Sequence, residues 1–234
     1  MDVIVSKAKL RPILLAVMAV IVAAGVAVEV LKPIYELKTR SGVVPLLSLS
    51  YEQNLPSFYS AALLLGCSLL LALVAQGARN NRERFVPYWW ILSAGFLYIA
   101  IDEVLSFHEE LSKLMALGGV LHFSWVIPAA VLVLVLGAAY IPFLRGLPRP
   151  IRIRFLLAGA IYVGGAVGME LPLGYWTVHH GTDNLGYGLI DAGEEALEML
   201  GLNLFLFALL DHLAQKGWAV RFTSGKAPEP PSAP

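Results

Sequence analysis

The sequence has 234 residues, of which 58% are hydrophobic and 15% charged, with 17 basic and 17 acidic side chains. This apolar composition excludes an ordinary soluble globular domain, and the zero formal net charge gives no general attraction to nucleic acid. The one cysteine, Cys67, excludes an intrachain disulfide.

Six apolar segments are long enough to cross a hydrocarbon core of ~30 Å, which takes about 20 residues. They lie at 10–31, 57–76, 87–107, 123–143, 155–173 and 192–212. The sequence therefore predicts an all-α polytopic membrane protein, with six transmembrane helices in a single domain over residues 1–222. The Pro- and Ser-rich segment 223–234 is predicted to be a disordered cytoplasmic tail.

The first apolar segment has a competing interpretation. Lys7, Lys9 and Arg11 precede it and small residues occur near its end, as in a cleaved secretory signal. The segment is long for a signal peptide, which favours a retained span.

Basic residues are distributed unequally between the two sides of this predicted bundle. Thirteen lie at the termini and in the loops after the second and fourth spans, and four lie on the opposite side. Because Lys and Arg in short loops stay inside, both termini are predicted to be cytoplasmic. Thirteen of the 17 acids lie on the opposite side, so the formal charge is about +9 inside and −9 outside. The predicted location is a bacterial plasma membrane, with the acids facing the periplasmic side.

The end of the third span carries AIDEVLSFHEEL, residues 100–111. At ~100° per residue, Asp102 and Glu109 share a helix face, and Glu103 lies on a neighbouring stripe. His108 points about 120° from Asp102, and joins it only if the helix ends or bends there. A wetted helix end is the alternative for His108 and Glu109, but Asp102 and Glu103 lie deeper, where a charge is costly.

The sixth span opens with LIDAGEEALEMLG, residues 189–201. Asp191 and Glu194 are explained by the helix dipole if they lie in the first turn. Glu195 and Glu198 lie further along the same face and need a partner. In the fifth span, Glu170 reaches the same level just before Pro172, which is predicted to end that helix.

Other polar residues are candidates for a mouth or lid above these acids. Glu52 precedes the second span, where Asn54 is a candidate helix cap, and it could fold over the site or lie in water. The loop after Pro172, LGYWTVHHGTDNLGYG, contains His179 and His180 and has the length of a lid, although adjacent histidines are often incidental. Below the acids the helix faces are apolar, so the polar region is predicted to be a cup that opens outward.

So many carboxylates in one cup require protonation, bound metal or exposure to water. Carboxylates with imidazoles on facing helices form ligand sets for iron, manganese or zinc, and carboxylates alone suit magnesium or calcium. The candidate metal ligands are Asp102, Glu103, His108, Glu109, Glu170, Glu195 and Glu198. Of these, Glu103 and Glu195 are the candidate catalytic carboxylates. The Glu-x-x-His motif of di-iron bundles is absent, which argues against a di-iron centre.

Four segments, YEQNLPSFYS, DEVLSFHEEL, GGAVGME and EEALEMLG, occur in this order. In these the chain resembles a set of uncharacterised bacterial multi-pass membrane proteins, over spans two to six. The resemblance implies an architecture and no activity.

Three functions fit the sequence. The first is a metal-dependent enzyme that acts on a lipid or amphiphile from the outer leaflet. The second is a transporter or ion-binding protein whose carboxylates hold protons or cations, although no internal repeat is visible. The third is a non-catalytic subunit, and an oligomer is compatible with the sequence. No phosphate-binding loop, G-x-S-x-G or H-E-x-x-H motif is present.

The unequal distribution of basic residues generates a topological prediction. Accessibility reporters at Arg82 and Arg149 should report the cytoplasmic side, and one at Thr182 should report the opposite side. If Thr182 and Arg149 report the same side, the acids are not gathered on one surface of the membrane.

Overall fold

The computed structural model describes residues 7–37, 39, 41–108 and 117–218, and within these ranges the chain forms helices and no strand. The α-helices are α1 (Lys7–Ile34), α2 (Val43–Leu47), α3 (Leu55–Asn80), α4 (Val86–Leu105), α6 (Val126–Ala139), α7 (Ile141–Gly146), α8 (Arg149–Val163), α9 (Glu170–His180) and α10 (Leu185–Lys216). A short 3₁₀ helix, η1 (Gly119–Leu121), and a π-helix, η2 (Gly164–Met169), complete the list. The predicted tail lies outside the described residues, as does Glu109.

The predicted all-α class is confirmed, and five helices in the described chain are long and apolar enough to cross a membrane. These are α1, α3, α4, the continuous segment Arg149–His180 and α10. The fourth predicted segment is instead divided into α6, of 14 residues, and α7. Pro142 lies in the first turn of α7 and has no N–H to continue the helix from α6, which accounts for the break.

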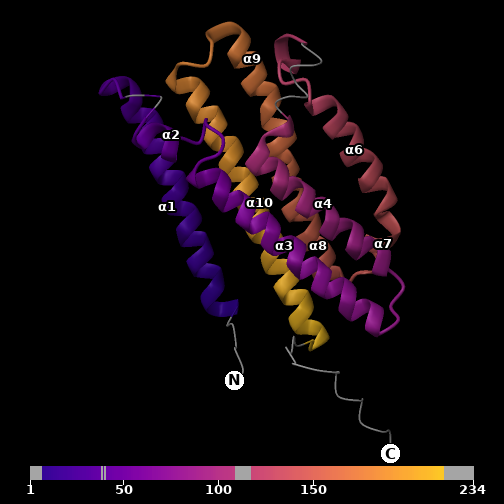
Figure 1. Cartoon of the computed structure of the whole chain (residues 1–234). Coiled ribbons are helices and arrows are strands. Elements are labelled where there is room, and N and C mark those ends of the chain that lie inside the picture. The colour runs from indigo at the N-terminus through magenta and orange to yellow at the C-terminus, as the bar shows by residue number, and fades with distance from the viewer. Residues whose placement is uncertain (1–6, 38, 40, 109–116, 219–234) are drawn as a thin grey trace, which may run out of the picture.

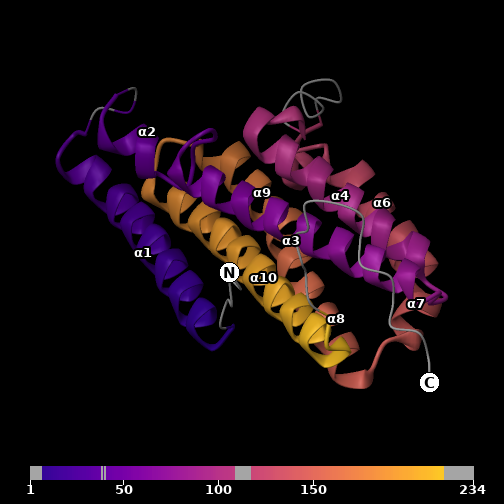
Figure 2. The ribbon, with the colours of Figure 1, turned by 60° about the horizontal axis from the view of Figure 1, so that its bottom comes forward.

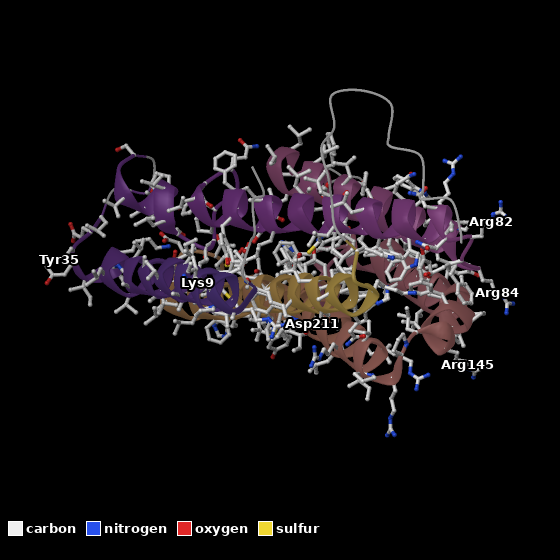
Figure 3. All side chains as sticks on the ribbon, turned by 90° about the horizontal axis from the view of Figure 1, so that it is seen from below. Lys9, Tyr35, Arg82, Arg84, Arg145 and Asp211 are labelled. Carbon is white, nitrogen blue, oxygen red and sulfur yellow. The ribbon has the colours of Figure 1, made fainter. Side chains whose placement is uncertain are left out.

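The two ends of the bundle differ in charge, as the sequence predicts. The start of α1, the end of α10 and the α3–α4 and α7–α8 connections lie together at the bottom of Figure 1. We call this the basic end, and Figure 3, which views the molecule from below, shows Arg82, Arg84 and Arg145 at its rim. The opposite end, where α1 finishes and α10 begins, is the acidic end.

Helix α10 is the central element of the bundle. It packs against α1, α3, α8 and η2, and Figure 2 shows it between α1 and α3. In its most apolar stretch 61% of the residues are buried, against 17 to 44% for the other four candidate spans. Many apolar side chains of the outer helices are exposed instead, such as Val20 and Leu134, as expected for surfaces that contact lipid.

Apolar packing closes the half of the bundle nearest the basic end. Leu202, Phe205 and Leu209 of α10 are buried in one core with side chains from α3, α4 and α8. Ser68 and Ser93 cross-link α3 and α4, because each hydroxyl donates to the other residue's carbonyl oxygen, at 2.8 and 2.9 Å. Small polar residues of this kind allow membrane helices to approach closely.

The prediction that Pro172 ends the fifth span is wrong. The helix continues through η2 into α9 and ends at His180, so most of the predicted lid, including His179 and His180, is helical. Pro172 lies in the first turn of α9, and the wider π-turn before it changes the hydrogen-bonding register where its missing N–H would interrupt an α-helix.

The sixth span begins earlier than predicted, at Leu185 in place of Ala192. Asn184 caps it, because its side chain accepts a hydrogen bond of 3.0 Å from the backbone N–H of Tyr187. No acid lies in the first turn of α10. The helix dipole therefore does not explain Asp191 or Glu194, because its effect fades within one turn.

The contact between α8 and α10 depends on Gly201. A Cβ atom at this position would lie 2.7 Å from the backbone nitrogen of Tyr162 and 2.8 Å from its Cβ. Gly201→Ala should therefore force the helices apart and destabilise the protein by about 1–3 kcal/mol. Gly193→Ala is the matched control on α10, since its nearest neighbour, Met169 Cε, would be at 3.6 Å. Thermal unfolding in detergent, followed by circular dichroism, measures both, and equal stability of the two variants would contradict the proposed close contact.

Candidate functional site

The candidate site begins where α4 ends. Ser106 adopts a left-handed conformation, with φ of 52°, and its N–H donates to the carbonyl of Asp102 at 2.6 Å. The chain therefore turns, and brings His108 back onto Asp102. The His108 backbone N–H donates to Asp102 Oδ1 at 3.2 Å, and its Nδ1 lies 2.9 Å from Oδ2. The sequence predicts a contact between His108 and Asp102 only if the helix ends or bends before His108. Helix α4 ends at Leu105, so this condition is met.

Glu52 lies over the end of α4. Its Oε2 accepts a hydrogen bond of 3.4 Å from Ser106 Oγ, and its Oε1 lies 3.9 Å from His108 Nε2. Asn54 caps α3, as predicted, because its side chain accepts from the Ser57 N–H at 3.1 Å. The capped turn thus places Glu52 beside the α4 residues.

Glu170 lies at the junction of η2 and α9 and is only 7% exposed. Its Oε1 accepts a hydrogen bond of 2.9 Å from the indole N–H of Trp125, just before α6. The Trp125 ring centroid is 5.1 Å from that of His108. Trp125 therefore connects the α4 end to Glu170, a role for which the sequence gives no signal beyond an aromatic residue near a membrane interface.

The acids of α10 lie alongside η2 and face the end of α4. Glu195 and Glu198 are within electrostatic range of each other and of Glu103, and Glu194 is within range of Glu170. Close approach depends on Gly165, where a Cβ atom would lie 2.9 Å from the Glu194 carbonyl oxygen and 3.1 Å from Glu198 Cγ. Carboxylates from three helical segments are therefore near enough to repel one another.

Two of these carboxylates each have a buried oxygen without a hydrogen-bond donor among the described residues. Glu194 is 8% exposed, and among the described residues Glu194 Oε2 and Glu195 Oε2 are buried and accept no hydrogen bond. A buried, ionised oxygen without a donor costs several kcal/mol in a low-dielectric environment. This part of the molecule is therefore suited to take up positive charge.

The predicted metal-ligand set is not assembled as a coordination sphere. Within the described ranges, no three His, Cys, Asp or Glu side chains are arranged to hold a metal ion. The physical reason at α4 is local, because both carboxylate oxygens of Asp102 are directed to His108. Metal binding thus stays a prediction, and so does the open cup. Two hollows in the described part of the bundle, one beside Asp211 and one beside His212, lie at the basic end.

His179 and His180 make their contacts within α9 and its connection to α10. His179 Nδ1 lies 2.8 Å from the Tyr175 carbonyl oxygen, and the His180 ring packs on Trp176 at 4.4 Å. Both histidines are exposed. They lie in the last turn of α9, and among the described residues they make no hydrogen bond or ion pair with the carboxylates of the candidate site.

Glu29 is a polar residue of the acidic end that no motif in the sequence singles out. It lies on α1, is fully buried, accepts a hydrogen bond from Ser48 Oγ and pairs with Lys32 Nζ at 2.9 Å. Gly188 of α10 leaves the space for it, because a Cβ atom there would overlap the Glu29 carboxylate, with its Cδ at 2.9 Å. The available signal was a Glu and a Lys three residues apart within an apolar span.

Comparison with known proteins identifies a family and no activity. The chain belongs to the family described as a domain of unknown function (DUF8692), whose profile matches residues 7–213. This agrees with the resemblance to an uncharacterised family. No curated protein and no solved structure matches the chain.

Proposed function

We propose that this member of a family of unknown function is an integral membrane protein that binds a cation between α4, η2–α9 and α10, and that it uses a divalent metal there on a lipid or amphiphilic substrate. The observation that carries the proposal is the pair of buried oxygens, Glu194 Oε2 and Glu195 Oε2, that accept no hydrogen bond from the described residues. A cation supplies the positive charge that such carboxylates need.

The candidate ligands are carboxylates from facing helices. They are Glu103 of α4, Glu170 at the start of α9, and Glu194, Glu195 and Glu198 of α10. Glu194 is an addition to the predicted set, since it is more buried than the sequence indicated. An all-oxygen ligand set favours magnesium, calcium or manganese over iron and zinc, because iron and zinc are selected by sets that include imidazole or thiolate ligands.

The chemistry that a metal would supply is activation of water or polarisation of a carbonyl or phosphoryl oxygen. Glu103 and Glu195 are the candidate catalytic carboxylates. Asp102 orients His108 through two hydrogen bonds, so His108 is positioned as a proton carrier at the rim. The Asp102 and His108 side chains are 17% and 24% exposed, which gives water access to them.

The substrate is expected to approach from the leaflet at the acidic end, because buried Leu202, Phe205 and Leu209 close the half of the bundle nearest the basic end. The basic end is proposed to face the cytoplasm, by the distribution of Lys and Arg. The carboxylates would then lie at the periplasmic level of a bacterial plasma membrane.

A second candidate is that the carboxylates hold protons in place of a metal, as in a proton-coupled or ion-binding membrane protein. The same two oxygens, Glu194 Oε2 and Glu195 Oε2, favour it, because a proton bound to one buried carboxylate removes its charge and needs no extra space. The closed apolar half of the bundle weighs against a continuous transport path in this conformation.

Chelation distinguishes the two candidates. If a metal is bound, a chelator at neutral pH should lower the stability of the purified protein by about 2–4 kcal/mol, because a ligand that binds only the folded state stabilises it. The ion should also be lost as the pH falls, since carboxylates must be deprotonated to bind it. Thermal unfolding with and without chelator, together with elemental analysis, measures this.

Two substitutions test whether the chelator acts through the carboxylates of the proposed cation site. Glu195→Gln should abolish most of the chelator effect while leaving expression intact. Asp183→Asn is the matched control, because Asp183 is an exposed acid at the same end of the bundle. A protein without metal, indifferent to chelator and stabilised by mild acid, would contradict the metal proposal and support bound protons.

A further inference from the structure

A second group of charged residues lies near the C-terminal end of α10, whereas the carboxylates of the proposed cation site lie in its first half. A hollow of about 260 Å³ opens beside α10, lined by the charged residues Arg11, Arg154 and Asp211 and by apolar residues that include Leu157 and Phe207. The lining therefore combines charged residues, whose basic side chains reach the surface, with apolar residues; we call the charged part the charged edge. That combination matches an amphiphile and does not match a small hydrophilic ion.

Basic side chains outnumber acids at the charged edge. Asp211 Oδ1 lies 2.9 Å from Lys7 Nζ and 2.6 Å from Arg11 Nη2, and Oδ2 pairs with Arg154 Nη1. One buried carboxylate thus joins cations from α1 and α8, which leaves a formal excess of positive charge. Arg11 Nε is buried and has no hydrogen-bond partner among the described residues.

The cations can also reach outward. The side chains of Lys7, Arg11 and Arg154 are 49%, 37% and 53% exposed, whereas that of Asp211 is 9% exposed. The Arg11 guanidinium lies 5.6 Å from the centroid of the Phe207 ring, and Phe207 is one of the apolar residues that line the hollow. A phosphate at this edge would meet donors from two helices, and an acyl chain below it would lie along Leu157 and Phe207.

We infer that this hollow binds an anionic glycerophospholipid of the leaflet at the basic end, with its phosphate between Arg11 and Arg154 and one acyl chain in the hollow. Charge complementarity selects an anionic headgroup, because the single negative charge of Asp211 offsets only one of the three cations at this edge. The apolar lining selects a lipid over free phosphate, since inorganic phosphate would leave that surface without a partner. The site is independent of the proposed cation site.

Binding of a fluorescent short-chain phosphatidylglycerol to the purified protein in neutral detergent tests the inference, with phosphatidylcholine as the neutral lipid. The protein should prefer phosphatidylglycerol, and Arg11→Gln with Arg154→Gln should weaken its binding roughly thirtyfold, since each basic residue contributes about a factor of five. Arg145→Gln with Arg149→Gln is the matched control. Arg145 lies at the rim of the same end, away from Asp211 (Figure 3).

Two further measurements separate the alternatives. Asp211→Asn should retain or strengthen phosphatidylglycerol binding, because the lipid phosphate then replaces the lost carboxylate. An excess of inorganic phosphate should not displace the lipid. The inference is overturned if both lipids bind equally, if the control pair weakens binding as much as the Arg11 and Arg154 pair, if inorganic phosphate displaces the lipid, or if Asp211→Asn abolishes binding while the protein remains folded.

Discussion

A charge buried among apolar helices must be neutralised, and this constraint acts differently at the two ends of α10. Near its C-terminus, Asp211 is surrounded by Lys7, Arg11 and Arg154, so the chain supplies the compensating charge and in doing so fastens α1 and α8 to the central helix. In its first half, Glu194 and Glu195 have buried oxygens for which the described chain supplies no donor. The same helix is therefore held by ion pairs at one end and has, among the described residues, buried carboxylate oxygens without a donor at the other.

The architecture was largely accessible from the sequence because apolar length and charge distribution are local properties. The helical class, five of the spans and the Asn54 cap follow from them. The helix through Pro172 was not accessible, because a π-turn depends on the packing of Gly165 against α10, which no local pattern encodes. The early start of α10 was missed for a related reason, since a polar, Gly-rich stretch such as 181–188 is typical of a loop.

The contact between Asp102 and His108 was partly accessible from the sequence, and the contacts of Glu170 were not. The spacing of residues placed Asp102 and the α10 acids at one level of the bundle, and made the contact between Asp102 and His108 conditional on a helix end, which Ser106 provides. The indole of Trp125 on Glu170 depends on a contact across 45 residues. Such a pairing is fixed by tertiary packing, so sequence spacing on one helix does not reveal it.

In this account, Lys7, Arg11 and Arg154 neutralise Asp211, whereas a bound cation or proton from outside the described chain neutralises Glu194 and Glu195. Unfolding of Asp211→Asn and Glu195→Gln, compared in chelator at neutral pH, tests this most directly. The Asp211→Asn variant should have a free energy of unfolding lower by about 1–3 kcal/mol, because the charge-assisted hydrogen bonds from Lys7, Arg11 and Arg154 are removed. Glu195→Gln should be as stable as the parent protein or more stable, because a repulsive buried charge is replaced by a neutral group of similar shape. Equal destabilisation of both variants would show that the chain itself satisfies Glu195, and would contradict the account.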